Sequence, residues 1–401
     1  MIGKDDRTAM TFALAFIIGA SAMSTDMYLP ALPMLVKQWG VSEAQGGLTL
    51  SMYFVAYSIS MLIYGPLSDR YGRRPIMLFG LIFFSLASLL CATAQDMSQL
   101  IAYRVLQSIG AGAGTAVGTA MCRDSFEGAL RQRVYAYIGV IIGVAPIVAP
   151  SLGGLILEVA AWQWIFVVQG LYGLAALVCA WCMADTLPQE DRTAEIGFIT
   201  RYRTLFRNRE YMMATVVFCL VMAPFYAHLA TSPFIYMKFF GLDQGDFARF
   251  FALNALGMML GAWLCAKLSK RVSGVAINTT GFCIVILAGA CMIAVGGNGP
   301  LWFALPMVAC SFGTGIGRPV SVSLSLEQVN RDIGSASSMM TFILLLFGAG
   351  IMWLASLDWP SRPVMIGIFA LCGGGITLML WPVMLRMFRR RGTDRCLYPE
   401  K

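Results

Sequence analysis

Two ionisable residues stand well inside long apolar stretches of the first half of this sequence: Asp26 in TDMYLPALP and Arg104 in YRVLQSIGAGAG. A charged group in a hydrocarbon core is costly, so each is a candidate for function. Desolvation favours the neutral form of a carboxyl group, and a nearby guanidinium favours its charged form. A change in the separation of Asp26 and Arg104 could therefore load or release a proton. The alternative is a permanent structural pair between two helices.

The depths of these two residues follow from helical geometry. Asp26 lies roughly 25 Å along a helix that starts at Ala9, at 1.5 Å per residue. Arg104 lies near the start of the fourth apolar stretch, which runs in the opposite direction, and therefore at a similar depth from the outer face. Both groups should reach the outer half of the membrane, where an ion pair or a water-bridged pair between them is geometrically reasonable.

The elements that would position these residues are membrane-spanning helices. The 401 residues are 58% hydrophobic and only 12% charged, whereas soluble domains carry about 25% charge. The apolar residues form long blocks, each long enough to cross a bilayer as a helix. We predict an all-α integral membrane protein with twelve spans, at 9–30, 47–66, 75–94, 99–121, 134–157, 162–184, 211–236, 247–268, 275–296, 301–325, 335–356 and 363–386.

The longest polar stretch separates six of these spans from the other six. We therefore expect an N-terminal six-helix bundle (1–184), a cytoplasmic linker (185–210) and a C-terminal six-helix bundle with a basic cytoplasmic tail (211–401). A faint repeat supports two related halves, because LSDRYG at Leu67 recurs as LSKRVS at Leu268. Parallel repeats of this kind imply two pseudo-symmetric bundles with a site at the level of the membrane midplane.

The distribution of basic residues predicts the orientation. The net charge is +8, and the loops on the side opposite the termini contain only Lys37, Lys238, Arg249 and Arg362 among the 29 Lys and Arg residues. The positive-inside rule then places both termini in the cytoplasm. Positive charge confined to short loops argues against a nucleic-acid partner, and the basic tail 386–391 should attract anionic membrane lipid. We interpret the first apolar block as a retained helix rather than a cleaved signal.

A short charged segment, GPLSDRYGRRP, lies between the second and third spans. The glycines should allow a tight turn, and the charged side chains should fix it in water. The residues that define it are Gly65, Asp69, Arg70, Gly72, Arg73 and Arg74. An ordinary basic loop is the simpler interpretation. The spacing nevertheless resembles the conformational-switch loop between spans two and three of the major facilitator superfamily.

The fourth and fifth spans contain two further motifs. Glycines at short intervals in span four, among them Gly110, Gly114 and Gly118, should let other helices approach closely. The segment that begins at Arg104 resembles the second superfamily signature, in which that arginine is linked to proton transfer. In span five, APSLGG resembles the antiporter signature, with alanine at its first position instead of glycine, and it favours export over import. The residues of this antiporter motif are Pro146, Pro150, Gly153 and Gly154.

Five motifs occur in order through the first half: TDMYLPALP, GPLSDRYGRRP, YRVLQSIG, APSLGG and WQWIF. Together they resemble the bicyclomycin and chloramphenicol resistance branch, Bcr/CflA, of that superfamily. The resemblance implies alternating access with proton entry driving multidrug efflux from the bacterial inner membrane, with protons as coupling ion, no other cofactor, and a monomer. It narrows the substrates to phenicols, bicyclomycin-like compounds, sulfonamides or an amphipathic metabolite, and gives Asp26 a part in proton and substrate coupling. Ile18, Gly19 and Ala22 stand where broad-range relatives carry an additional acidic residue, which puts a preference for cationic drugs in doubt.

A substrate cavity should be lined by aromatic, Met and polar residues of the central spans, which suit loosely specific apolar binding. The candidates are Tyr28, Tyr53, Tyr57, Met222, Tyr226, His228, Tyr236, Asn254 and Phe347. Each of them could equally serve helix packing. Arg318 also falls within a span, and a gating role is conceivable for it.

Two other functions are open. Proton-driven uptake by symport could use the same scaffold. A membrane-embedded enzyme is the less favoured alternative, because one histidine, scattered cysteines and no HExxH, GxSxG or Walker motif leave no catalytic or metal-binding constellation.

Overall fold

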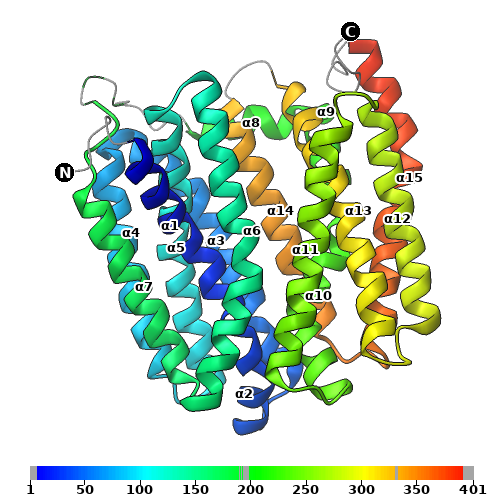
Figure 1. The fold of residues 1–401 in the computed structure, drawn as a ribbon. Helices are drawn as coiled ribbons and strands as arrows, with labels where there is room; N and C mark the ends of the chain where they lie inside the picture. Colours follow the sequence, from blue (N-terminus) through cyan, green and yellow to red (C-terminus); the bar gives the residue numbers. More distant parts are fainter. Residues whose placement is uncertain (1–6, 189, 191, 193–197, 330–332, 392–401) are drawn as a thin grey trace. The chain divides into compact units, whose positions relative to one another are not determined.

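The computed structural model describes residues 7–188, 190, 192, 198–329 and 333–391. They are almost entirely helical, and the chain divides into two compact units, Met1–Phe198 and Ile199–Lys401 (Figure 1). Each of the twelve predicted spans overlaps helical structure, and two of them, 9–30 and 211–236, are divided into shorter helical segments. Eleven segments within the described residues are long and apolar enough to cross a membrane.

The first unit contains the helices α1 (Arg7–Asp26), α2 (Leu32–Gln38), α3 (Glu43–Tyr71), α4 (Arg73–Ala92), α5 (Met97–Ser125), α6 (Gly128–Val159) and α7 (Gln163–Cys182). Helix α5 packs against α1, α3 and α4 at once. Its glycines make these contacts close: a Cβ atom at Gly110 would overlap the backbone of Phe84, and one at Gly118 would lie 2.8 Å from the side chain of Ile18. The prediction that these glycines form a packing surface is confirmed.

Helix α5, with 29 residues, is long enough to cross a membrane but is not among the eleven segments that are also apolar enough. Its buried positions include Arg104, Gln107, Ser108 and several glycines, which lower its mean hydropathy. Since α5 packs against three other helices, it depends on protein contacts more than on contact with lipid.

The second unit contains α8 (Phe198–Arg207), α9 (Arg209–Val221), α10 (Ala223–Pro233), the π-helical turn η3 (Phe234–Phe239), α11 (Gln244–Leu268), α12 (Gly274–Val295), α13 (Pro300–Glu327), α14 (Ile333–Ser356) and α15 (Arg362–Arg391). Helix α13 packs against α11 and α12 through paired glycines. A Cβ atom at Gly315 would overlap the carbonyl oxygen of Met258, and one at Gly281 would lie 2.6 Å from the carbonyl oxygen of Gly313.

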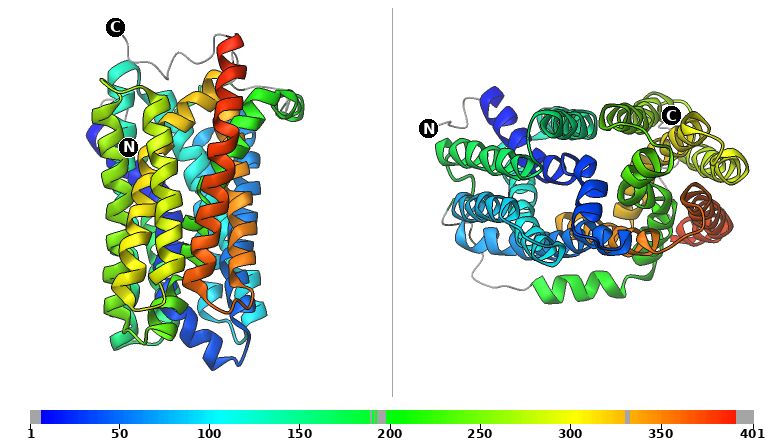
Figure 2. Two further views of the ribbon diagram at one scale, coloured as in Figure 1. Left: turned by 90° about the vertical axis from the view of Figure 1, so that its right-hand side faces the viewer. Right: turned by 90° about the horizontal axis from the view of Figure 1, so that it is seen from below.

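The short helix α8 lies in the stretch predicted as a linker. In the right-hand view of Figure 2 it is seen lengthwise, whereas the long helices of the second unit are seen end-on, so it crosses them. Leu205 anchors it in a small apolar cluster with Tyr211, Ala336 and Met339. Asn208 ends the linker: its side chain caps α9 by accepting from the backbone N–H of Tyr211.

Two sequence-based predictions about local structure are wrong. The first span does not end at residue 30, because helical structure continues to Gln38. Gly65 does not lie in a turn, because α3 runs through it to Tyr71, and the connection to α4 is Gly72 alone. Of the charged residues that were expected to interrupt the helix, Asp69 and Arg70 occupy the last turn of α3, and Arg73 and Arg74 begin α4.

Candidate functional site

Asp26 is the last residue of α1 and lies at a break within the first span. The break follows from Pro30 and Pro33, which lack the N–H groups that would bond the carbonyls of Asp26 and Leu29. The chain therefore passes through the 3₁₀ turn η1 (Leu29–Ala31) before α2 begins. Asp26 is 5% exposed, and its carboxylate accepts a hydrogen bond of 3.0 Å from the Thr25 hydroxyl. Because the span continues to Gln38, Asp26 lies deeper than a span ending at residue 30 would place it.

Arg104 in α5 is fully buried beside the same segment. Its Nη1 donates to the carbonyl oxygen of Ser24 (2.8 Å) and to Oε1 of Gln107 (2.6 Å). The amide nitrogen of Gln107 donates in turn to Oε1 of Gln169 (2.8 Å) and to the Ser88 hydroxyl (2.7 Å). These bonds join α1, α4, α5 and α7 in one buried polar network.

Aromatic rings enclose the Arg104 guanidinium. Its carbon atom lies 4.4 Å from the ring centre of Tyr53, 5.1 Å from that of Tyr28 and 6.0 Å from that of Phe166. Ring faces at these distances attract a cation. Two of its donors, Nε and Nη2, are buried without a hydrogen-bond partner among the described residues.

Asp26 and Arg104 do not form a direct ion pair in the part of the chain that the structure describes. Arg104 reaches the carbonyl of Ser24, two residues before Asp26, instead of the carboxylate. Of the two arrangements expected from the depths, the direct ion pair is therefore not formed among the described residues, because depth along a helix leaves the rotation about the helix axis undetermined. The structure brings both residues to the same segment of α1 but does not bring the carboxylate and the guanidinium within ion-pair distance.

The antiporter-like motif contacts this segment as well. Gly153 of α6 lies against Met27, and a Cβ atom at Gly153 would overlap the Met27 carbonyl oxygen. Gly154 is buried beside it. Pro146 and Pro150 lie within α6, which continues through both to Val159. The motif therefore provides a side-chain-free surface against the break that follows Asp26.

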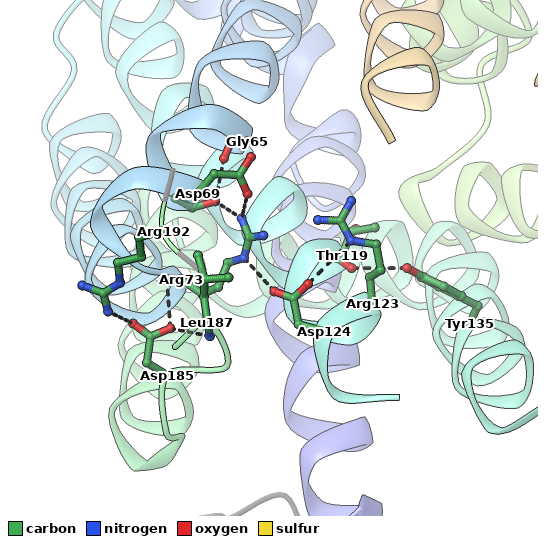
Figure 3. A network of polar contacts seen from close by, with 11 residues as sticks. Gly65, Asp69, Arg73, Thr119, Arg123, Asp124, Tyr135, Asp185, Leu187 and Arg192 are labelled. Atoms are coloured by element: carbon green, nitrogen blue, oxygen red, sulfur yellow. Dashed lines mark hydrogen bonds and ion pairs between the residues drawn. The ribbon is translucent and has the colours of Figure 1, made fainter. Parts of the chain in front are cut away.

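The segment predicted to be a conformational-switch loop is organised by Arg73, which is 2% exposed (Figure 3). Its guanidinium pairs with Asp69 at 2.6 Å and with Asp124 of α5 at 2.8 Å, and it donates to the Ser68 hydroxyl at 2.7 Å. Arg73 thus joins the end of α3 to the end of α5 from the start of α4. A buried arginine with two carboxylate partners satisfies most of its donors and fixes these helix ends.

The backbone of the loop is held by Asp185, which follows α7. Asp185 accepts from the backbone N–H of Arg73 at 3.0 Å and pairs with Arg192 at 3.1 Å (Figure 3). Gly72 has a φ of +100°, and a Cβ atom there would overlap the Asp185 carboxylate. A glycine is therefore required at this turn for both conformation and space.

The other two arginines of the loop have separate contacts. Arg74 donates to the carbonyl oxygen of Trp181 at 2.7 Å and lies 5.4 Å from its ring centre. Arg70 is exposed and lies 5.2 Å from the ring centre of Tyr71.

The second unit contains a cavity of about 160 Å³ formed by α9, α10, α12, α13 and α14. It is lined by Thr215, Phe218, Cys219, Val221, Met222, Tyr226, Phe282, Gly313, Thr314, Gly317, Arg318, Ser321, Val322, Ser325, Met340, Thr341, Leu344 and Leu345. Met222 and Tyr226 were among the residues predicted to face a substrate. The ring of Tyr226 packs on Gly348, where a Cβ atom would lie 2.7 Å away.

The remaining cavity candidates lie elsewhere. Tyr57 is buried and donates to the Thr115 hydroxyl at 2.8 Å, while Tyr28 and Tyr53 flank Arg104. Asn254 accepts from the Ser311 hydroxyl at 2.6 Å. His228 lies among the rings of Tyr236, Phe251 and Phe303, with no hydrogen-bond partner among the described residues for either ring nitrogen. Phe347 is half-buried and does not line the cavity.

Four polar residues of these sites were not identified from the sequence: Gln107, Gln169, Asp124 and Asp185. Gln107 offered a signal, because it falls in the R-x-x-Q segment that starts at Arg104. The two aspartates follow directly after the predicted spans 99–121 and 162–184, where an acidic residue is indistinguishable from an ordinary loop residue. Among the described residues no group of three or more His, Cys, Asp or Glu side chains could hold a metal ion.

Comparisons with known proteins agree with this architecture. The sequence is 30% identical to the MFS-type transporter YdgK of Bacillus subtilis over 86% of this chain and 88% of that protein. It is 27% identical to the multidrug resistance protein MdtL of Citrobacter koseri (93% and 94% covered) and 26% identical to multidrug resistance protein D of Escherichia coli K12 (93% and 95%).

Solved transporter structures share the fold. A POT family transporter in complex with 5-aminolevulinic acid matches with a TM-score of 0.74 at 14% identity, covering 93% of this chain and 96% of that one. A D-xylose–proton symporter matches with a TM-score of 0.69 at 13% identity, with the same coverage. The protein thus has the fold of these solved structures. The family model of the Major Facilitator Superfamily matches residues 14–344, and the chain belongs to that superfamily of membrane transporters, which are not enzymes.

Proposed function

We propose that this transporter exports small amphipathic drugs or metabolites in exchange for protons, as a member of the Bcr/CflA branch. The observation that carries the proposal is Asp26, a carboxyl group buried at a break in the first span, with Arg104 nearby but no ion pair to a basic residue among the described residues. A carboxyl group in such a place can be neutral or charged depending on small changes around it, which is what a coupling site requires.

Arg104 is close enough to the Asp26 segment to change the protonation of Asp26 when it moves. It is bound to the Ser24 carbonyl and to Gln107, and two of its donors are unused. A rearrangement that moves the guanidinium toward Asp26 would favour the carboxylate and release a proton. The reverse movement would favour the neutral acid and take a proton up.

The direction of transport is supported by two observations. Gly153 of the antiporter-like motif packs on Met27, so this motif directly contacts the residue next to Asp26. The relatives MdtL and multidrug resistance protein D are named for drug resistance. The fold itself also occurs in a proton symporter, so it does not determine the direction.

We further propose that the protein works as a monomer in the bacterial inner membrane with both termini in the cytoplasm. Protons are its coupling ion, no other cofactor is involved, and its basic cytoplasmic segments contact anionic lipid. The conformational-switch loop, with Arg73 at its centre, would hold the helix ends of the first unit in one state and release them in another during alternating access.

The direct test is proton-driven transport in inverted membrane vesicles that contain the protein. A radiolabelled phenicol should accumulate when respiration acidifies the vesicle interior and should leave when an uncoupler is added. Accumulation without dependence on the proton gradient would remove proton coupling. Export of the phenicol from inverted vesicles in response to the gradient would instead identify a symporter.

A further inference from the structure

The cavity of the second unit contains one charged residue, Arg318 of α13. It lies about 14 Å from the last residue of that helix, at 1.5 Å per residue, and its side chain is exposed. Within the described residues no carboxylate lies within ion-pair distance of it. A charged group in a membrane-spanning helix without a counter-charge is a candidate binding group.

Among the described residues of the second unit, no acidic residue lies in the middle of a membrane-spanning helix, where it could balance the charge of Arg318. The acidic residues that the structure describes there lie in a first turn, in a last turn or between helices: Glu210, Asp243, Asp246, Glu327 and Asp358. None of them lines the cavity. The cavity therefore offers positive charge and no negative charge to a bound molecule.

Four hydroxyl groups of α13 and α14 line the cavity, and their hydrogens are already used. Each donates to a carbonyl of its own helix one turn earlier: Thr314 to Cys310, Ser321 to Gly317, Ser325 to Ser321 and Thr341 to Ser337, at 2.7–3.0 Å. Toward a ligand these oxygens retain lone pairs, so they can accept hydrogen bonds. The Thr215 hydroxyl of α9 has no hydrogen-bond partner among the described residues and can donate or accept. Arg318 is then the charged donor of the cavity, and the four hydroxyl groups of α13 and α14 are acceptors.

The other walls are aromatic and apolar. Phe218, Tyr226 and Phe282 lie in the lining with Met222 and Leu345. A volume of about 160 Å³ leaves room for a substituted benzene ring, since apolar cavities of about 150 Å³ bind benzene. The buried amide of Asn278, which has no hydrogen-bond partner among the described residues, lies behind Gly317 at the edge of this space.

We propose that this cavity binds small aromatic organic anions that carry N–H or O–H donors, with Arg318 contacting the acidic group. The carboxylate or deprotonated acid accepts from the guanidinium, the ring packs between the aromatic side chains, and the donors meet the hydroxyl oxygens. The inference rests on the proposed transport function and assigns a substrate class to it: anions are preferred over neutral analogues, and neutral analogues over cations.

A matched series of probes tests the charge preference directly. 4-Aminobenzoate is an anion, its ethyl ester is neutral, and procaine joins the same aminobenzoyl group to a cationic tail. Binding to the detergent-purified full chain is measured by calorimetry for the wild type and for Arg318→Gln, Arg318→Lys and Arg249→Gln. Arg249 is an exposed residue of the same unit, paired with Asp246, and serves as the control for loss of one positive charge.

The wild type should bind 4-aminobenzoate at least tenfold more tightly than the ester. Arg318→Gln should remove that difference while changing ester affinity less than twofold, and Arg318→Lys should restore most of it. Arg249→Gln should leave all affinities unchanged. Equal loss of acid and ester binding in Arg318→Gln, tightest binding of procaine, or no binding of any probe by the wild type would overturn the proposal.

The experiments distinguish failure of the proposed anion site from failure of the proposed proton-driven export. Charge-selective binding without proton-driven transport would reject the exporter and keep the anion site. Proton-driven transport with no charge preference would reject the anion site and keep the exporter.

Discussion

Gly153 of α6 lies against the carbonyl oxygen of Met27, the residue that follows Asp26 at the break of the first span. This contact joins the antiporter-like motif to the candidate proton site. Only a residue without a side chain leaves space for it.

Replacing Gly153 with alanine should disturb this contact. The added methyl group overlaps the Met27 carbonyl, so α6 or the break must shift, at a cost of about 1–3 kcal/mol as for other overpacked sites. Thermal unfolding in detergent should show the loss of stability, and proton-driven drug accumulation in vesicles should fall. Gly139→Ala in the same helix is the matched control, because nothing lies within 4 Å of its Cβ position. Equal behaviour of the two variants would contradict the role of this contact.

Gly72→Ala tests the turn of the conformational-switch loop. The φ of +100° and ψ of 153° fall in a region that is essentially restricted to glycine, which costs about 1–3 kcal/mol for alanine. The methyl group would also displace Asp185 from the backbone N–H of Arg73. The variant should unfold at a lower temperature than Gly128→Ala, whose glycine has a φ of +52° and no atom within 4 Å. A similar loss in both would show that backbone conformation alone explains the effect.

Arg73→Gln should destabilise the first unit more than loss of a neighbouring arginine. It leaves Asp69 and Asp124 without their counter-charge, and we expect a loss of about 2–3 kcal/mol, reduced from the fully buried case because Asp69 is 35% exposed. Arg123→Gln, with a 49% exposed side chain 3.6 Å from Asp124, should change stability by less than about 1 kcal/mol. Denaturant unfolding of both variants measures the difference, and comparable values would argue against Arg73 as the centre of the network.

Gly348→Ala should reduce ligand binding in the second unit. The methyl group would push the Tyr226 ring toward the cavity that it lines. We expect a loss of 4-aminobenzoate affinity of about tenfold, which is about 1.4 kcal/mol of binding free energy. Gly350→Ala on the same helix has no atom within 4 Å of the new methyl group and should bind as the wild type does. Unchanged affinity in Gly348→Ala would show that Tyr226 does not shape the binding site.

The sequence predicted the features that depend on local composition. Twelve apolar blocks, the cost of a buried charge at Asp26 and Arg104, and glycines that bring helices together can all be recognised without a structure. It did not predict the length of α3, because charged residues at a helix end can be solvated and need not interrupt the helix. Nor did it predict the break at Asp26, although Pro30 and Pro33 were visible in the motif.

The sequence did not predict contacts between residues that are far apart in the chain. Arg73 binds Asp124 and, through its backbone, Asp185, and neither aspartate differs in its local sequence from any other loop acid. The neutral partners of Arg104 were also missed, since a buried arginine leads one to expect a carboxylate. Gln107, a backbone carbonyl and aromatic faces take that place in the structure.

The central claim is that Asp26 carries the coupled proton. The measurement that tests it most directly is ligand-induced proton release from the detergent-purified protein, followed with a pH indicator in weak buffer, for the wild type beside Asp26→Asn. Asparagine keeps the size and polarity of the side chain and removes the titratable group. The account predicts release from the wild type when a phenicol binds and none from Asp26→Asn with binding retained. Equal release from both proteins would contradict it and assign the proton to another group.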